Sequence, residues 1–303
     1  MELNPDKKLG ETEKKSIISS QEKLEGTKIK QREKDDPSLV RTNVIKGPLV
    51  VMFGPSHVGK TVTLLRLTQY LESRVGGLVK PVANFRNDNS YLETIERFNE
   101  IKEDSYLAPE STGEMDFLLL DVSWDGRPKF QILEAPGEHF FDPKDTTKPY
   151  HSYFETILNS EYKKLFIFFF EVDMFESNTQ REEYGKRISK LLSQNTKPGR
   201  DRAIVLCNKV DSTEYFQGGL PVYSEIKRVI YEDPNYQSLK KSLSKSRLGR
   251  IYFVPFSAGS FKSYDDDRGV VFTMSKEHYA KELFRSIEKC LFPSWWDNFF
   301  GGQ

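Results

Sequence analysis

Short apolar runs alternate with longer amphipathic stretches over most of the chain. The runs LVVMF at 49–53, LFIFFFEV at 165–172, AIVLC at 203–207 and IYFVPF at 251–256 are apolar on both faces of a strand. Helix-like stretches such as TVTLLRLTQYL lie between them. Strands that are buried on both faces and separated by helices are typical of a parallel sheet. The pattern therefore predicts an α/β fold, with a mostly parallel sheet and helices on both faces.

Residues 116–134 depart from this pattern. Two strand-like segments flank the dipeptide Asp125-Gly126, which favours a tight hairpin. We therefore expect one antiparallel pair at the edge of the sheet. Long insertions separate the predicted elements at 77–115, 138–152 and 212–249. The last of them has the pattern of one or two short helices broken near Pro234.

The two ends of the chain differ from its middle. Residues 1–40 contain no aromatic side chain and are rich in Lys and Glu, so they bury too little apolar surface to offset the entropy of ordering. The stretch LFPSWWDNFFGGQ at 291–303 is dense in Trp and Phe. It is expected to pack on its own domain or, alternatively, to dock to a partner or a membrane interface. We expect a disordered charged arm at 1–46, a main domain with insertions at 47–292 and an aromatic tail at 293–303.

Composition narrows the function only slightly. Lys plus Arg and Asp plus Glu each number 45, so the net charge is zero and gives no reason to expect a nucleic acid partner. The two cysteines are too few for a disulfide framework. The longest apolar run, at 165–170, is far shorter than the ~20 residues that span a bilayer, and the N-terminus is charged where a signal peptide needs an apolar core. We expect a cytoplasmic protein without a transmembrane segment.

The segment GPSHVGKT at 54–61, called the P-loop below, fits the phosphate-loop pattern G-x-x-x-x-G-K-[ST] and lies between an apolar run and a helical pattern. Gly54 and Gly59 let backbone N–H groups turn toward phosphates. Lys60 reaches the β and γ phosphates, and the hydroxyl of Thr61 binds the bridging magnesium ion. The predicted nucleotide contacts also include three further loop residues, Ser56, His57 and Val58. The alternative is a strand-to-helix turn that contains Gly-Lys-Thr by chance.

The tetrapeptide NKVD at 208–211 follows the run AIVLC, which places it at the carboxyl end of a strand, where ligands bind in open α/β sheets. An Asp at the base edge accepts hydrogen bonds from N1–H and the 2-amino group of guanine, and adenine offers neither donor in that arrangement. We therefore assign Asp211 to base choice, Lys209 to packing along the ring, and Asn208 to tying this loop to the P-loop. Taken alone, the tetrapeptide is better explained as a solvated turn.

The segments GPSHVGKT, LEAPGEH, NKVD and FSAGS occur in this order, each after a strand-like run. Together they resemble the GTPase domain of the translation-factor and Ras-like (TRAFAC) class of P-loop proteins over roughly 47–292. The long insertions and the APGE sequence are more similar to the prokaryotic double-GTPases, although only one set of motifs is present here. The resemblance implies a P-loop NTPase architecture, GTP or GDP with Mg²⁺ as ligands, and slow hydrolysis of GTP to GDP and phosphate. It also implies a molecular switch that acts on a protein effector or regulator.

The third motif of this family, D-x-x-G, holds magnesium through its Asp and meets the γ-phosphate through the backbone of its Gly. Glu134 and Gly137 match those positions, so the resemblance implies a longer metal-binding carboxylate here. The alternative for Glu134 is a carboxylate that merely ends an edge strand. The family's switch threonine, a further magnesium ligand, matches Thr112, for which a simple turn residue is the alternative.

The residue that orients the attacking water in this family follows the motif's Gly and is often Gln or His. Glu138 takes that position, with His139 next to it. A carboxylate can accept a proton from water but is repelled by the nearby phosphate, and His139 can substitute if the loop shifts by one residue. These residues leave three outcomes open: slow intrinsic hydrolysis, hydrolysis helped by a partner, or binding with hardly any turnover.

The fifth motif matches Ser257, Ala258 and Gly259, where the resemblance implies a backbone N–H to the guanine oxygen and where Gly259 replaces the usual Lys. Arg74 and Arg86 are near enough in sequence to be candidates for a transition-state arginine, although arginines in such places are usually solvated. Two other functions remain as alternatives. One is a non-hydrolysing pseudo-GTPase that binds GTP or GDP as a structural ligand, and the other is an ATP-using P-loop enzyme.

Overall fold

The computed structural model describes residues 36–103, 117–171, 174–175, 177–194, 196–197, 199–212, 216–217, 220–221, 227, 230–245, 251–263 and 270–293. Three expectations lie outside these residues: the first part of the predicted arm, the switch role of Thr112, and nearly all of the aromatic tail. None of the helices in the described part combines the length and apolarity that crossing a bilayer requires.

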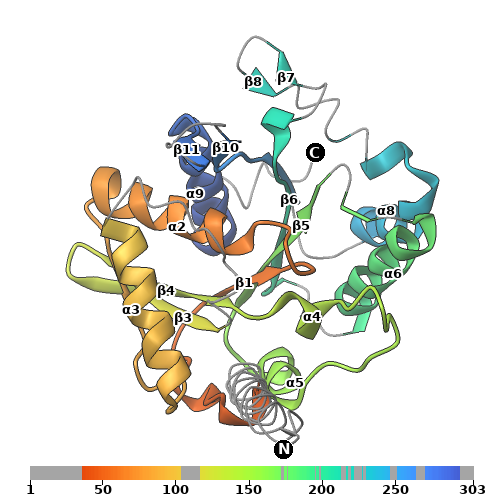
Figure 1. Cartoon of the computed structure of the whole chain (residues 1–303). Helices are drawn as coiled ribbons and strands as arrows, with labels where there is room; N and C mark the ends of the chain where they lie inside the picture. The colour runs from red at the N-terminus through yellow and green to blue at the C-terminus, as the bar shows by residue number, and fades with distance from the viewer. Residues whose placement is uncertain are drawn as a thin grey trace, which may run out of the picture.

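A seven-stranded sheet forms the centre of the described part (Figure 1). Its strands lie in the order β2 (Leu78–Pro81), β3 (Leu118–Trp124), β4 (Arg127–Glu134), β1 (Leu49–Phe53), β5 (Lys164–Phe170), β6 (Arg202–Cys207) and β9 (Tyr252–Pro255). The five strands from β4 to β9 run parallel, whereas β2 and β3 are antiparallel to their neighbours. The predicted α/β fold with a mostly parallel sheet is confirmed.

The hairpin predicted at 116–134 is formed by β3 and β4. Asp125 and Gly126 both have positive φ, 53° and 67°, as a tight two-residue turn requires. The outermost strand on this side is β2, however, which pairs with β3 and lies within the insertion predicted at 77–115. The antiparallel edge therefore has three strands.

Helices cover both faces of the sheet. Because successive strand residues point to opposite faces, Leu49, Val51 and Phe53 belong to one buried cluster and Val50 and Met52 to the other. The first cluster is covered by α4 (Gly137–Phe140), α5 (Ser152–Asn159), α6 (Asn178–Gln194) and α8 (Gln237–Lys245). The second is covered by α2 (Lys60–Tyr70), its π-helical continuation η3 (Leu71–Val75), α3 (Asn89–Glu103) and α9 (His278–Leu291). Figure 1 shows this layered arrangement.

The smaller elements lie in the insertions and at the N-terminal side. The break near Pro234 is confirmed, since the 3₁₀ turn η6 (Pro234–Tyr236) precedes α8. Two small hairpins were not predicted from the sequence: β7 (Phe216–Gln217) with β8 (Leu220–Pro221), and β10 (Gly259–Ser263) with β11 (Val270–Met274). The remaining 3₁₀ turns are η1 (Pro37–Leu39), η2 (Thr42–Val44) and η5 (Val210–Ser212).

The packed domain begins before Gly47. Residues 36–46, which the sequence analysis placed in the disordered arm, contain η1 and η2. Val44 and Ile45 are buried in the first core cluster. Val40 is partly buried and packs against the same cluster. The described end of the arm is therefore part of the domain.

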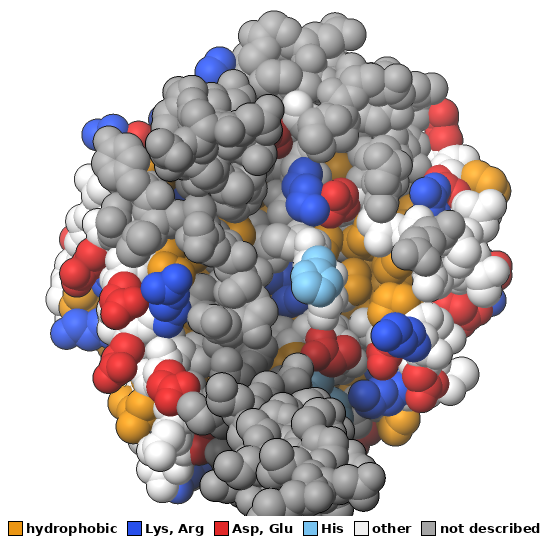
Figure 2. Space-filling view, in the orientation of Figure 1, with side chains coloured by type: hydrophobic (Ala, Val, Ile, Leu, Met, Phe, Trp, Pro, Cys, Tyr) orange, Lys and Arg blue, Asp and Glu red, His pale blue; other side chains and the backbone are white. Residues whose placement is uncertain are grey.

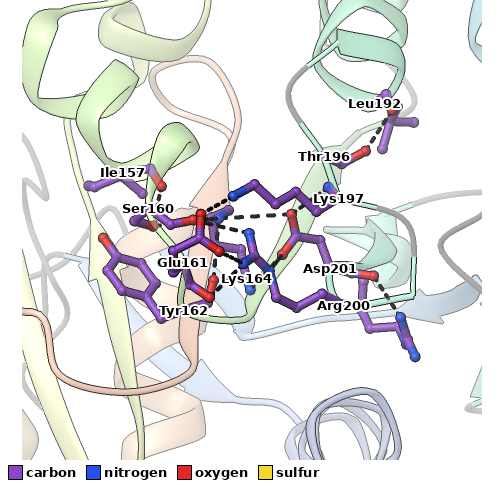
Figure 3. Close-up of polar contacts among 11 residues, drawn as sticks. Ile157, Ser160, Glu161, Tyr162, Lys164, Leu192, Thr196, Lys197, Arg200 and Asp201 are labelled. Atoms are coloured by element: carbon purple, nitrogen blue, oxygen red, sulfur yellow. Dashed lines mark hydrogen bonds and ion pairs between the residues drawn. The ribbon is translucent and has the colours of Figure 1, made fainter.

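A buried ion pair lies at the amino-terminal ends of β5 and β6 (Figure 3). Lys164 and Asp201 are both fully buried, with Nζ and Oδ2 3.9 Å apart. Asp201 also accepts hydrogen bonds from the backbone N–H groups of Lys164 (3.1 Å) and Lys197 (2.8 Å). Lys164 Nζ donates to the carbonyls of Ser160 (3.1 Å) and Tyr162 (3.3 Å). Both charges are thus solvated by the protein itself, as buried charges require.

Candidate functional site

Four loops meet at the carboxyl edge of the sheet, following β1, β4, β6 and β9. Strand β1 lies between β4 and β5, so the chain passes to both sides of it. In open α/β sheets, ligands bind at such a switch point. On this face of the molecule, Figure 2 shows basic and acidic side chains gathered near the middle, beside apolar surface.

The P-loop has the backbone that its glycines predict. Gly59 has φ 83° and is the N-cap of α2, and His57, which is exposed, has φ 64°. A Cβ at Gly54 would lie 2.9 Å from the Cβ of Phe169, so only glycine fits against β5. The loop therefore turns directly into the N-terminus of α2, where backbone N–H groups have no intrahelical partner and anions bind.

Lys60 is buried under the loop that precedes it. Its Nζ donates to the carbonyls of Gly54 (3.2 Å) and Pro55 (3.0 Å), and the residue is only 6% exposed. Burial lowers the pKa of Lys60, while the carboxylates of Glu134 and Glu138 act to raise it. The predicted phosphate ligand thus lies between two acidic side chains.

The loop after β6 is joined to the P-loop by one hydrogen bond. Asn208 is buried, and its Nδ2 donates to the carbonyl of Val58 at 2.8 Å. This contact matches the role predicted for Asn208. A Cβ at Gly59 would lie 2.4 Å from the same nitrogen, so the absence of a side chain at 59 makes the contact possible.

The loop after β4 lies directly on the P-loop. Thr61 Oγ1 donates to Glu134 Oε1, which brings the two predicted metal ligands together. Ser56 Oγ donates to Glu138 Oε2 at 2.5 Å. A Cβ at Gly137 would lie 2.1 Å from the backbone nitrogen of Ser56, so the two backbones are in close contact.

His139 lies away from these contacts. It is 4% exposed, its Nδ1 is 3.1 Å from the Tyr153 hydroxyl, and its ring centroid is 4.0 Å from that of His151. Burial, followed by the nearby cationic groups, lowers the pKa of His139 to about 3. Of the two candidates for orienting water, the structure therefore brings Glu138 to the P-loop and places His139 in an aromatic cluster.

The residues predicted to recognise the base lie on the loops after β6 and β9. Asp211 is half-buried and lies in η5, which begins directly after Lys209. Lys209 has φ 53°, and its Nζ is 2.9 Å from Glu171 Oε2. Ser257 is buried after β9. Asn208 Oδ1 and Ser257 Oγ are buried and have no hydrogen-bond partner among the described residues. Two unsatisfied buried polar atoms at one sheet edge are typical of a site for a polar ligand.

No protein-family model matches the chain, and no curated protein matches it. Among solved structures, elongation factor SelB from Methanococcus maripaludis, in its apo form, gives a TM-score of 0.36 at 14% identity, covering 82% of this chain and 34% of that one. A protein described as nucleolar GTP-binding protein 1 from Plasmodium falciparum gives 0.38 at 11% identity, covering 84% and 90%.

The GTPase-like domain of Ski7 from S. cerevisiae, bound to GDP and inorganic phosphate, gives a TM-score of 0.35 at 15% identity, covering 70% of this chain and 43% of that one. The chain thus spans about a third of the length of the SelB structure and less than half of the Ski7 structure. Identities and TM-scores this low do not carry function from one protein to another. The site has to be interpreted from its own residues.

Several predicted residues are not brought to the P-loop. Arg74 is exposed and pairs with Glu277 at 2.8 Å. Arg86 is buried, with its Nε 2.9 Å from Asp88 Oδ2 and its guanidinium 4.8 Å from the centroid of the Phe117 ring. Both candidate arginines are therefore paired with residues outside the P-loop.

The sequence analysis missed how the fifth motif is held. Gly259 begins β10, with φ 139°, and Ala258 accepts a hydrogen bond at 3.2 Å from the backbone of Ser275, which follows β11. Ser275 Oγ donates to the carbonyl of Ser257 at 2.5 Å, and Arg66 of α2 donates to the carbonyl of Ser275 at 3.1 Å. These residues are far apart in the chain, so no local sequence pattern indicates the contacts.

Proposed function

We propose that the chain binds GTP and GDP with Mg²⁺ at the carboxyl edge of the sheet and hydrolyses GTP slowly, as a switch for a protein partner. The hydrogen bond from Asn208 to Val58 carries the proposal. It joins a loop with the residues for guanine recognition to a loop with the residues for phosphate binding. A nucleotide carries both groups on one molecule, so the two loops need to be held at a fixed separation.

The phosphate side of the proposal rests on the P-loop backbone. The left-handed Gly59 and the N-terminus of α2 supply N–H groups and the positive end of a helix dipole. Lys60 is already stripped of most of its water, so a phosphate that replaces the carbonyls of Gly54 and Pro55 gains a charge-assisted contact without further desolvation of the amine.

The base side rests on Asp211 and two unsatisfied atoms. The carboxylate of Asp211 would accept from N1–H and the 2-amino group of guanine. The guanine base would gain two further polar neighbours, Asn208 Oδ1 and Ser257 Oγ. Adenine would leave the carboxylate without these donors, which disfavours ATP.

The residues present also fit a magnesium ion. Mg²⁺ prefers oxygen ligands and is usually bound by one or two carboxylates together with substrate phosphates. Thr61 and Glu134 bring a hydroxyl and a carboxylate into contact, and no cluster of three or more metal-binding side chains competes with them in the described residues. When bound there, the ion would offset the negative charge of the phosphates.

Slow hydrolysis follows from what surrounds the γ-phosphate position. Glu138 is the residue at the P-loop that could orient a water molecule, and its carboxylate carries the same sign of charge as the phosphate. Arg74 and Arg86, the two candidates for a transition-state arginine, are paired with Glu277 and Asp88. The same facts keep the rival function open, a protein that holds guanine nucleotide as a structural ligand.

Base preference tests the proposal. We expect GTP and unlabelled GDP to displace fluorescent GDP at far lower concentration than ATP does. Asp211→Asn replaces an acceptor by a donor, so GDP should bind at least about tenfold more weakly and xanthosine diphosphate, with a carbonyl at position 2, more tightly. Lys60→Ala should abolish binding of all these nucleotides.

Asp125→Asn is the matched control, because it makes the same chemical change in the β3–β4 turn, at the opposite end of β4. It should leave the preference unaltered. Equal displacement by ATP and GTP, or an unchanged preference in Asp211→Asn, would contradict the guanine assignment.

A further inference from the structure

Two carboxylates flank the lysine of the P-loop from the side of the β4 loop. Glu134 is buried and bonded to Thr61, and Glu138 is bonded to Ser56. Both interact with the charge on Lys60. In a P-loop, this lysine reaches the β and γ phosphates. Two negative charges therefore already interact with the lysine that a γ-phosphate would contact.

The backbone of the β4 loop adds a steric component. Gly137 approaches the P-loop so closely that a Cβ on it would lie 2.1 Å from Ser56 N and 2.2 Å from the carbonyl carbon of Pro55. The next residue, Glu138, extends this contact through its bond to Ser56 Oγ. The β4 loop therefore lies against the backbone of residues 55–56, although Ser56 itself remains exposed.

Residues 57–60 of the P-loop differ in exposure, with Val58 and Lys60 buried and Gly59 half-buried. His57 is exposed, and the N–H groups from His57 to Lys60 precede the first turn of α2. These groups are the ones that cradle the inner phosphates in this kind of loop. The contact with the β4 loop thus involves residues 55–56, which come before the N–H groups expected to cradle the inner phosphates.

We propose that the carboxylate of Glu138, held at the P-loop by its bond to Ser56, makes this site selective for nucleoside diphosphate over triphosphate. The inference rests on the proposed function, since it concerns the same guanine-nucleotide site. A diphosphate occupies the cradle and leaves the contact in place. A triphosphate has to break the contact, move Gly137 away from the P-loop, and place a further negative charge beside Glu138. Glu138 acts here as a specificity-determining residue.

We assign the selectivity to the charge of Glu138 and not to its hydrogen bond. The amide of glutamine has nearly the same shape and retains an oxygen that can accept from Ser56. Glu138→Gln therefore keeps the hydrogen bond but removes the repulsion. Glu138→Ala removes both. Glu93→Gln provides the control, since Glu93 is exposed on α3 and the change alters net charge equally.

The experiment measures the Kd of GDP and of the non-hydrolysable analogue guanylyl imidodiphosphate by calorimetry in the presence of Mg²⁺. The full chain should bind the analogue about tenfold or more weakly than GDP. In Glu138→Gln and Glu138→Ala this ratio should fall by about tenfold, through tighter binding of the analogue, with the Kd of GDP within about twofold of its original value. Glu93→Gln should keep the original ratio.

Equal affinities for the two nucleotides in the unmodified chain would overturn the inference while leaving the proposed function intact. So would a ratio in both Glu138 variants that matches the Glu93→Gln control. A chain that binds neither nucleotide would overturn the proposed function itself, and the inference with it. Thermal melting of each variant shows whether it is folded, and the alanine variant gives a second test if the glutamine variant is not.

Discussion

Glu138 and His139 are adjacent in the chain but lie in opposite environments. Glu138 is half-exposed and contacts the P-loop through Ser56. His139 is buried against Tyr153 and His151, and its pKa is lowered to about 3, so the imidazole is neutral near pH 7. Two adjacent residues of α4 thus differ in what they can contact. Glu138 can contact phosphate or water, whereas His139 packs in the core.

These environments predict the rate of hydrolysis. With Mg²⁺ and excess protein, a single turnover of GTP should proceed at about 10⁻⁴ to 10⁻² s⁻¹, the range of unassisted GTPases. Glu138→Ala should leave this rate equal or higher, since it removes repulsion from the γ-phosphate. His139→Gln should lower the melting temperature without changing the rate, because His139 acts in packing.

Two results would contradict this prediction. A rate of tens per second without a partner would exclude a slow switch. A drop of more than about tenfold in Glu138→Ala would mean that the carboxylate activates water instead of repelling phosphate. A rate equal to that of free GTP in every variant would favour the structural-ligand function.

At this scale the sequence predicted local backbone structure better than contacts between distant residues. The spacing of Gly54, Gly59, Lys60 and Thr61 identified the P-loop, because a local pattern fixes a local backbone. The bond between Ser56 and Glu138 joins residues 82 positions apart, and no local pattern encodes it. The buried position of His139 was equally hidden, since it depends on side chains from α5 and its preceding loop.

Strand β1, the P-loop and α2 act as one element. The strand ends at Phe53, the loop turns through left-handed residues at 57 and 59, and the helix begins at Lys60. Gly59 has two separate reasons to lack a side chain. Its φ of 83° disfavours any L-residue, and its Cβ position is taken by the amide of Asn208.

A pair of glycine variants separates these two reasons. Gly76 also has a left-handed φ, 68°, but a Cβ there meets nothing within 4 Å. Gly59→Ala and Gly76→Ala should both lose about 1 kcal/mol of unfolding free energy from backbone strain. Only Gly59→Ala should also weaken GDP binding, by tenfold or more, because it displaces Asn208 from Val58. Denaturant titration and GDP binding on both variants provide the measurement, and equal GDP affinity in the two would show that the Asn208 contact is not needed.

The elements themselves were predictable where the apolar pattern was strong. The fully buried strands β1, β5 and β6 were identified from their continuous apolar runs. Strand β2 escaped detection because it has four residues and only Val79 is buried. Its place in the sheet is decided by pairing with β3, a tertiary interaction.

The whole molecule separates its chemistry from its stabilising charges. The P-loop, Glu134, Asn208 and Ser257 lie at the carboxyl edge of the parallel strands. The buried pair of Lys164 and Asp201 lies at their amino-terminal edge (Figure 3). Strands β5 and β6, seven and six residues long, separate the two edges, so a change at one edge makes no direct contact with the other.

Removing the buried carboxylate tests this separation. Asp201→Ala leaves Lys164 buried without its counter-charge and deprives the backbone N–H groups of Lys164 and Lys197 of their acceptor. Loss of one partner from a buried pair removes roughly 3 kcal/mol or more of unfolding free energy. The burial that lowers the pKa of Lys164 lets the amine shed its proton, which limits the loss. Glu161→Ala, the control, removes an exposed carboxylate from the same cluster and should change stability little. At a temperature where both variants are folded, each should bind GDP with the Kd of the unmodified chain. A shift in Kd for Asp201→Ala would show that the two edges of the sheet are energetically coupled.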